Sequence, residues 1–583
     1  MTRDRIRRES EMASEQSPRD SAHGWAPVIS SDGVVAIHAA LVPTNNGDGE
    51  ILLFGGDNHS IDAAHAAQFD HSRRFNCRHP ELPLLYVQSP AFDVFCCGHA
   101  LLSDGRLLVA GGTLKFAADA GGIHHGEHFE GHRHCAIYEP SSGTFASAPD
   151  MGPQPGRLTG GGRWYPTLCT LADGEVLAFQ GHPAGDDTRH GNNTVERYQP
   201  STGKWVTLPT PVGDVRAQPI LYPRTHLLRD GSVFVSSRIN GFDRNICVDT
   251  VNGAARALSP LPDPAYHDFN CPSVLLPLVP NDDYRPRVLL AGGARSQLID
   301  LGQANPNWVD VPRDIPPPEI KMHPGATVSA LWRSGDTHLD LFATGTDGAV
   351  WSTWWEAEGG WRPWFLIRVV GRPRPHACAT LLPTGDVLLT GGAAPDNDQV
   401  GVMEPEFYNA PLDRRQGRYM VGTGMWRTIN DPASVLRNYH STALLMPDGK
   451  VWTAGGNSPH QPGQPPTPVQ EQIEIYEPPY PPGPRPKIVS CPSSIRYNSE
   501  FSVGVLNAAA IACIVLMRYG SSTHAFNPDQ RAILLRFQAT GAATLVATAP
   551  PSGTVAPPGP YMVFVVDDVG RPCEYARFVH VSA

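Results

Sequence analysis

The sequence has little charge, no long hydrophobic run and no block of basic residues. Charged residues make up 18% of the 583 residues, below the ~25% typical of soluble domains. No apolar stretch reaches the ~18 residues that a membrane-spanning helix needs. The formal net charge is −11, and the sequence contains no cluster of basic residues. These absences argue against nucleic-acid binding and against a membrane protein.

The N-terminus also lacks the apolar segment of a secretory signal. Residues 1–24 are charged and polar, so we expect a disordered tail. The location stays unknown, with the cytoplasm as the default in the absence of a visible signal. The eleven cysteines form no Cys-x-x-Cys pair and show no zinc-binding spacing. A structural zinc site is therefore not indicated.

Gly and Pro, by contrast, are abundant, with 57 and 58 residues. Together they form about a fifth of the chain, against a usual ~12%. Both are unfavourable in helix interiors, which excludes a mainly helical fold. Many short strands joined by tight turns are predicted instead.

One pattern recurs seven times: an apolar segment, a Gly-containing turn, a second apolar segment and a pair of small residues. The copies span 33–56, 99–112, 165–181, 222–237, 271–293, 376–392 and 440–456. Each copy predicts a β-hairpin, and segments such as YEPSSGTF (138–145) supply outer strands. Seven four-stranded units predict a Kelch-type β-propeller over residues 25–477, with an array of β-sandwiches as the alternative.

The fifth and sixth copies are about 35–40 residues further apart than the other neighbours. The extra residues, about 315–370, include HLDLFATGTDGAVWSTWWEAEGGWRPWF (338–365), which holds five of the twelve tryptophans. This segment resembles a single blade of the sialidase-like, fucose-binding propeller lectins. Two interpretations stay open: a plug packed on the outer wall of the propeller, and a glycan-binding surface on tryptophan faces.

The composition changes after the repeats. PPYPPGPRP (478–486) predicts a stiff linker. Residues 487–583 contain seven short alternating apolar segments separated by Pro and Gly turns, a pattern typical of an immunoglobulin-like sandwich. The predicted fold class is all-β: a seven-bladed propeller followed by this sandwich.

Four short motifs place reactive side chains beside predicted strands. They are DVFCCGH (93–99), GRWYPT (162–167), RNYHST (437–442) and SSTHAFNPDQR (521–531). The innermost strand of each blade starts at one face of the propeller, so Cys96, Tyr165, Tyr439 and His440 can converge near the axis. Imidazole suits copper, iron, nickel and zinc, and a tetragonal nitrogen–oxygen site favours Cu(II).

In the same order, these motifs resemble those of the copper radical oxidases, the galactose oxidase and glyoxal oxidase family. The resemblance covers about residues 25–583 without the insert. It implies an oxidase that uses copper and O2 to convert a primary alcohol or aldehyde into an aldehyde or carboxylic acid plus hydrogen peroxide. RWYP is closer to the glyoxal oxidase branch, so galactose is not assumed as substrate. A non-catalytic Kelch-type carbohydrate-binding protein is the alternative function.

The resemblance also implies the roles of individual residues. The copper ligands would be Tyr165, Tyr439, His440 and His524. A thioether between Cys96 and Tyr165 would make this tyrosine the radical ligand, and Cys96 is preferred to Cys97 because it directly follows Phe95. Tyr439 would accept the hydroxyl proton of the substrate. Copper and the tyrosyl radical would each take one electron.

Two loops depart from the family pattern or stand outside it. Residues 180–192 lack the Trp that covers the thioether in the fungal galactose oxidases, which leaves His182 or His190 as candidate covers. Residues 121–135 carry five histidines: His124, His125, His128, His132 and His134. We interpret them as a polar loop between blade strands, with a substrate-facing rim or an adventitious second metal site as alternatives.

Overall fold

The computed structural model describes most of residues 24–583. Outside the described residues are 1–23, 45–46, 56–71, 116–117, 120–121, 124–128, 153–160, 185–190, 214–220, 240, 263–270, 294–295, 312–328, 334–337, 345–348, 363–364, 370–373, 395–396, 423 and 458–468. Among the described helices, none has the length and apolar character needed to cross a membrane.

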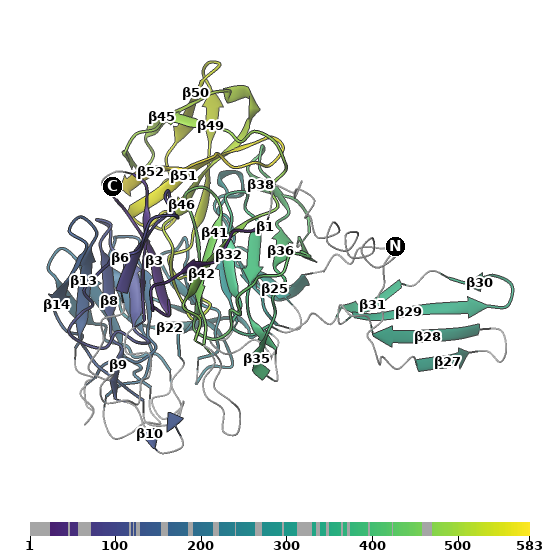
Figure 1. Cartoon of the computed structure of the whole chain (residues 1–583), viewed down its shortest axis with the longest axis horizontal. Coiled ribbons are helices and arrows are strands. Elements are labelled where there is room, and N and C mark those ends of the chain that lie inside the picture. The colour runs from purple at the N-terminus through teal and green to yellow at the C-terminus, as the bar shows by residue number, and fades with distance from the viewer. Residues whose placement is uncertain are drawn as a thin grey trace, which may run out of the picture.

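Seven antiparallel sheets form the blades of a propeller (Figure 1); each is built on four strands, and the first and last blades carry a fifth. The first strands are β3 (His38–Val42), β7 (Gly98–Leu101), β15 (Thr167–Thr170), β19 (Thr225–Leu227), β23 (Ser273–Leu275), β32 (Cys378–Leu381) and β40 (Ser441–Leu445). The second strands are β4 (Glu50–Phe54), β8 (Leu107–Ala110), β16 (Val176–Phe179), β20 (Val233–Val235), β24 (Arg287–Leu290), β33 (Val387–Thr390) and β41 (Val451–Gly455).

The third and fourth strands complete each blade on its outer side. The third strands are β5 (Ser72–Asn76), β13 (Cys135–Glu139), β17 (Val195–Gln199), β21 (Arg244–Val248), β25 (Ser296–Asp300), β36 (Glu406–Asn409) and β42 (Gln472–Glu477). The fourth strands are β6 (Leu85–Tyr86), β14 (Thr144–Ala148), β18 (Lys204–Thr207), β22 (Ala255–Pro260), β26 (Trp308–Val311), β39 (Met425–Thr428) and β1 (Gly24–Trp25). The predicted seven-bladed propeller is confirmed.

Short ladders decorate the blades without changing their order. They pair β9 (Thr113–Lys115) with β12 (Glu130–Gly131), β10 (Ala118–Asp119) with β11 (Gly122–Ile123), β34 (Ala393–Ala394) with β35 (Asn397–Gly401), and β37 (Leu412–Asp413) with β38 (Arg418–Tyr419). Two single turns of 3-10 helix, η3 (Pro280–Asp282) and η5 (Ala508–Ala510), are also present.

The last blade is closed by the start of the described chain. Strand β42 pairs with β1, so that Gly24 faces Glu477 and Trp25 faces Tyr476. Strand β2 (Ile29–Ser30) extends the same edge. Gly24, expected as the last residue of a disordered tail, already lies in a strand, and residues 1–23 lie outside the described residues.

The C-terminal domain is a two-sheet sandwich above the propeller (yellow in Figure 1). One sheet contains β43 (Ile488–Ser490), β45 (Glu500–Val505), β50 (Thr544–Thr548) and β49 (Phe537–Ala539). The other contains β44 (Ser494–Arg496), β52 (Arg577–Ser582), β51 (Gly559–Asp567), β46 (Ile511–Arg518) and β48 (Ala532–Leu535). The predicted immunoglobulin-like sandwich is confirmed.

One strand of this domain leaves the sandwich. Strand β47 (Ser521–Thr523) pairs with β3 as a fifth, innermost strand of the first blade. It also contacts β7 and β40, the first strands of the neighbouring blades. The segment 520–534 therefore enters the propeller axis, and we call it the axial hairpin.

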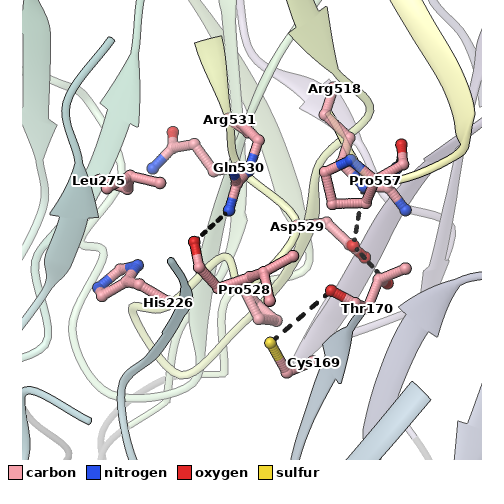
Figure 2. A pocket seen from close by; sticks show the side chains of 11 residues that line it. Cys169, Thr170, His226, Leu275, Arg518, Pro528, Asp529, Gln530, Arg531 and Pro557 are labelled. Carbon is pink, nitrogen blue, oxygen red and sulfur yellow. Dashed lines mark hydrogen bonds and ion pairs between the residues drawn. The ribbon is translucent and has the colours of Figure 1, made fainter. Parts of the chain in front are cut away.

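Polar groups of the axial hairpin bond to several blades (Figure 2). The carboxylate of Asp529 accepts from Leu101 N at 3.0 Å and from Thr170 Oγ1 at 3.0 Å, and also pairs with Arg518. Gln530 Oε1 accepts from Leu381 N at 2.6 Å, and Arg531 donates to Leu227 O at 2.7 Å. Unpaired backbone groups are costly when buried, so the hairpin satisfies the inner strands as well as filling the axis.

The insert forms a separate antiparallel sheet. Its strands are β27 (Ser329–Arg333), β28 (His338–Thr344), β29 (Ala349–Glu356), β30 (Gly360–Trp361) and β31 (Phe365–Val369). Figure 1 shows this sheet projecting from the propeller, so the expectation of a plug packed on the outer wall is wrong for its described residues. Trp351 is buried within the sheet, whereas Trp361 is 54% exposed. Trp364 lies outside the described residues.

Candidate metal centre

Five blades begin with a residue in the left-handed backbone region. Cys96, Tyr165, Tyr222, His376 and His440 lie one to three residues before β7, β15, β19, β32 and β40, with φ between 42° and 66°. This conformation costs of order 1–3 kcal/mol for a residue with a side chain and persists only where the surroundings impose it. The strained positions surround one end of the axis and mark it as a candidate site.

His524 reaches this end from the tip of the axial hairpin. Thr523 and Phe526 exchange backbone hydrogen bonds of 2.9 Å, which closes a two-residue turn. His524 and Ala525 occupy its centre with φ of 46° and 62°, the left-handed pair of a type I′ turn that normally takes Asn-Gly. Arg224 donates to His524 O at 3.0 Å and holds this strained turn in place.

The four predicted ligands come together in the structure. The hydroxyl oxygens of Tyr165 and Tyr439 are in hydrogen-bond contact. Tyr165 Oη lies 3.1 Å from His524 Nε2 and 3.5 Å from His440 Nε2. All four side chains are at least 90% buried. Two imidazole nitrogens and two phenol oxygens thus face one point, a donor set that suits copper(II).

Each imidazole is oriented through its other nitrogen. His524 Nδ1 bonds to Thr523 Oγ1 at 2.6 Å, and His440 Nδ1 bonds to Asn457 Oδ1. Such outer partners fix ring orientation and leave Nε2 available for a metal.

The buried pocket disfavours charge in the absence of a cation. Burial raises the pKa of Tyr165 well above its usual value, with further contributions from Cys96 and Tyr439. Burial also lowers the pKa of His524 well below its usual value, and His440 adds to this effect. A phenolate in such a pocket needs a neighbouring cation, so the residues present fit a copper ion.

The two cysteines of FCCG face different neighbours. Cys96 Sγ lies 3.8 Å from His524 Nε2, and the ligand atoms of Cys96, His440 and His524 lie within 4.8 Å of one another. Cys97 Sγ instead lies 3.9 Å from His38 Nε2. Cys96 thus lies at the donor cluster and helps to raise the pKa of Tyr165, whereas Cys97 contacts His38.

The cover of Tyr165 comes from its own motif. The Trp164 ring meets the Tyr165 ring edge to face at 4.1 Å, and Phe129 stacks on Trp164 at 4.4 Å. His182 contributes backbone hydrogen bonds to Trp164, and His190 lies outside the described residues. RWYPT contains this Trp, which is the signal that the sequence analysis missed.

Sequence reasoning also missed Tyr222, His376 and His38. The ring of Tyr222 lies 4.6 Å from that of Tyr165, and the ring of His376 lies 5.0 Å from that of Tyr439. Tyr222 begins YPRTHLLRDG just as Tyr165 begins YPTLCTLADG, so aligning the repeat heads would have identified it.

The described part of the histidine-rich loop has a structural role. His132 bonds to Asp93 O at 2.8 Å, next to the FCCG motif, and His134 bonds to Asp150 at 3.0 Å. Among the described residues, neither belongs to a group that could hold a metal. His124, His125 and His128 lie outside the described residues.

Comparisons with known proteins identify relatives of this chain. Residues 485–581 match the family described as galactose oxidase-like, early set domain. The aldehyde oxidase GLOX of Vitis pseudoreticulata is 30% identical over 442 residues, 72% of either chain. A galactose oxidase of Gibberella zeae is 22% identical over 575 residues, which is 95% of this chain and 70% of that one.

A solved structure has the same fold. A fungal alcohol oxidase of the AA5 family, in complex with copper, superposes with a TM-score of 0.65 over 96% of this chain and all of that one, at 19% identity. Fold, donor set and relatives together are those of a copper-dependent oxidase. The chain belongs to the galactose oxidase and glyoxal oxidase family, as the match to the aldehyde oxidase GLOX shows.

Proposed function

We propose that this protein oxidises a primary alcohol or an aldehyde with O2, giving an aldehyde or a carboxylic acid and hydrogen peroxide. The observation that carries the proposal is the convergence of Tyr165, Tyr439, His440 and His524 from two blades and the C-terminal domain. These four residues would hold copper. When bound, copper(II) accepts one of the two electrons that leave the substrate.

Cys96 and Tyr165 would provide the second redox centre. Joining Cys96 Sγ to the ring of Tyr165 removes one S–H and one ring C–H hydrogen. The two protons and two electrons pass to O2 and give hydrogen peroxide. The thioether donates electron density to the ring, lowers its oxidation potential and makes Tyr165 the residue that accepts the second substrate electron.

Tyr439 is suited to receive the hydroxyl proton of the substrate. Its oxygen contacts that of Tyr165, and it is 6% exposed at the end of the axis. A phenolate within hydrogen-bond reach of a substrate hydroxyl can act as a general base. His376 packs against the Tyr439 ring and Trp164 against Tyr165, which keeps bulk water away from both.

A copper-loaded activity screen tests the function. Purified protein is loaded with copper, and peroxide release is measured with short alcohols, aldehydes and sugars. Tyr165→Phe is the matched control, since it keeps the ring and removes the ligand oxygen. Peroxide from the wild type and none from the variant is expected. A wild type that binds one copper but yields no peroxide would contradict the proposal and favour a non-catalytic carbohydrate-binding protein.

We further propose the insert as a glycan-docking sheet. The supporting observation is Trp361, which is 54% exposed on a sheet that projects from the propeller. An exposed indole presents an apolar face to a sugar ring while its N–H stays in water. This role is independent of the copper site.

A further inference from the structure

The adjacent cysteines of FCCG raise a question of selection. Both Cys96 and Cys97 are fully buried, and both lie close to the axis end of the second blade. A thioether to Tyr165 needs one of them to be presented and the other to be held back. The backbone around them shows how this is done.

The backbone polar groups of residues 95–97 are bonded to fixed partners. Phe95 N donates to Asp93 Oδ1 at 2.9 Å, Phe95 O accepts from Thr113 Oγ1 at 3.0 Å, Cys96 O accepts from Tyr165 N at 2.9 Å, Cys97 N donates to Val94 O at 3.1 Å, and Cys97 O accepts from Tyr222 Oη at 2.7 Å. The remaining group, Cys96 N–H, donates to His38 Nε2 at 3.2 Å. Cys96 is fully buried and lies before the first residue of β7, so its N–H has no ladder partner and the imidazole supplies the acceptor that it needs.

His38 is held rigidly in the first blade. It is the first residue of β3 and pairs with Phe54 on one side and Thr523 of the axial hairpin on the other. Its ring is fully buried and stacks on Phe54 at 4.9 Å with an interplanar angle of 19°. Since Nε2 accepts the Cys96 N–H, the proton sits on Nδ1, which has no hydrogen-bond partner among the described residues.

The same nitrogen faces the thiol of Cys97. Cys97 Sγ lies 3.9 Å from His38 Nε2, within reach of a weak S–H donor. Burial raises the pKa of the Cys97 thiol well above its usual value, consistent with a thiol that stays protonated. One imidazole nitrogen thus anchors the peptide that presents Cys96 and contacts the sulfur that must be excluded.

We propose that His38 is a positioning residue that selects Cys96 over Cys97 for the bond to Tyr165. This inference rests on the proposed function, because it presumes the thioether. The selected reaction removes the Cys96 thiol hydrogen and one Tyr165 ring hydrogen, and two electrons and two protons pass to O2 as hydrogen peroxide. Without the His38 acceptor, Cys96 can relax from its left-handed conformation, and either sulfur can approach the ring.

The test compares His38→Leu with His38→Gln in the full-length protein. Leucine keeps the apolar volume and removes the acceptor, whereas the glutamine oxygen reaches about as far as Nε2. Each protein is purified without copper, loaded with copper in air, and followed by intact mass and by peptide mapping after alkylation of free thiols. Copper content and melting temperature are measured on the same samples.

In the wild type we expect a loss of two hydrogens, a Cys96–Tyr165 link and an alkylated Cys97. His38→Leu should form the link roughly 10–100-fold more slowly, as expected for a small misplacement of reacting groups, with part of it at Cys97. His38→Gln should restore the rate and the exclusive use of Cys96. Wild-type rate and exclusive linkage in a folded His38→Leu protein would overturn the inference.

Two further outcomes are distinguishable. If the wild type forms no link at all, the radical part of the proposed function fails, and this inference fails with it. If His38→Leu does not fold, Tyr222→Phe is the second variant. It removes only the hydroxyl that bonds to Cys97 O, the other side-chain contact that holds the backbone of the two cysteines. Unchanged rate and exclusive Cys96 linkage in Tyr222→Phe would likewise contradict selection.

Discussion

The C-terminal domain and the insert are both β-sheet modules attached to the same propeller, yet they relate to it differently. The C-terminal domain sends β47 and the axial hairpin into the axis, where it pairs with β3 and supplies His524. The insert begins after β26, and its described strands pair with one another. The two modules therefore differ in the hydrogen bonds that they make with the inner strands of the propeller.

The comparison shows that the C-terminal domain becomes part of the site because it hydrogen-bonds to backbone donors of the inner strands. Leu101 N and Leu381 N of the inner strands are bonded to Asp529 and Gln530 of the axial hairpin. Removing the hairpin would leave these buried donors without partners. Removing the insert would leave no comparable group unpaired among the described residues.

The largest effect is expected from truncation at about residue 484. The truncated chain loses one of two imidazoles and also the strand that pairs with β3. We expect loss of tight copper binding and a strongly destabilised propeller, measured by copper titration and thermal unfolding. Copper affinity equal to that of the full chain would show that His524 is not a ligand.

Asp529→Ala should destabilise the protein by about 3–5 kcal/mol, the usual cost of removing one partner of a buried ion pair. Asp529 and Arg518 are both buried, with Nε to Oδ1 at 3.2 Å (Figure 2). Urea unfolding of the metal-free protein measures the change. Asp568→Ala, in an exposed ion pair with Arg415, is the control and should cost at most ~1 kcal/mol.

Thr523→Val should lower copper affinity ~10–100-fold while leaving the fold intact, as for other outer partners of metal-bound imidazoles. Valine keeps the shape but can neither accept from His524 Nδ1 nor donate to Ile37 O. Competition titration with a copper chelator gives the affinity. Thr144→Val, on the outer strand β14, is the matched substitution and should bind copper normally.

Acid should loosen the axis through His226. Burial lowers the pKa of His226 to about 3, with smaller contributions from Arg531 and Arg224. In the unfolded chain this group has a pKa of ~6.5. Stability is therefore unaffected by His226 above pH ~6.5 and falls by up to about 1.4 kcal/mol per pH unit toward pH 3. His226→Gln should show a shallower acid dependence in urea unfolding, and an identical slope would contradict this.

Deletion of residues 315–370 should have the smallest effect on chemistry. We expect unchanged turnover on a small alcohol or aldehyde, because the copper site lies at the axis. If the insert docks glycans, KM for a glycosylated or polymeric substrate should rise. Parallel changes in the activities on both substrates would instead tie the insert to the propeller itself.

Local patterns made much of this fold predictable. Seven repeats of one hairpin pattern predicted seven blades, and the alternating apolar segments after residue 487 predicted the sandwich. The motifs around Cys96, Tyr165, Tyr439 and His524 led to residues that the structure brings together. Each of these features depends on a pattern that spans at most a few tens of consecutive residues.

The features that were missed depend on partners far apart in the chain. The family resemblance implied that His524 reaches the axis on a hairpin, but nothing in SSTHAF indicates that β47 pairs with β3, more than 470 residues earlier. The buried role of His38 depends on the backbone of Cys96, which belongs to another blade. Such contacts follow from the assembled axis and have no local signature.

The pairing of β1 with β42 means that the propeller can close only late in synthesis of the chain. Trp25 faces Tyr476 and its ring lies 4.8 Å from the Tyr476 ring, so the two strands are separated by about 450 residues of translation. At ~5–20 residues per second, the first strand waits on the order of 20–90 seconds for its partner. During that time the ring of blades is open, and β1 and the edge of the first blade need protection from pairing with other chains.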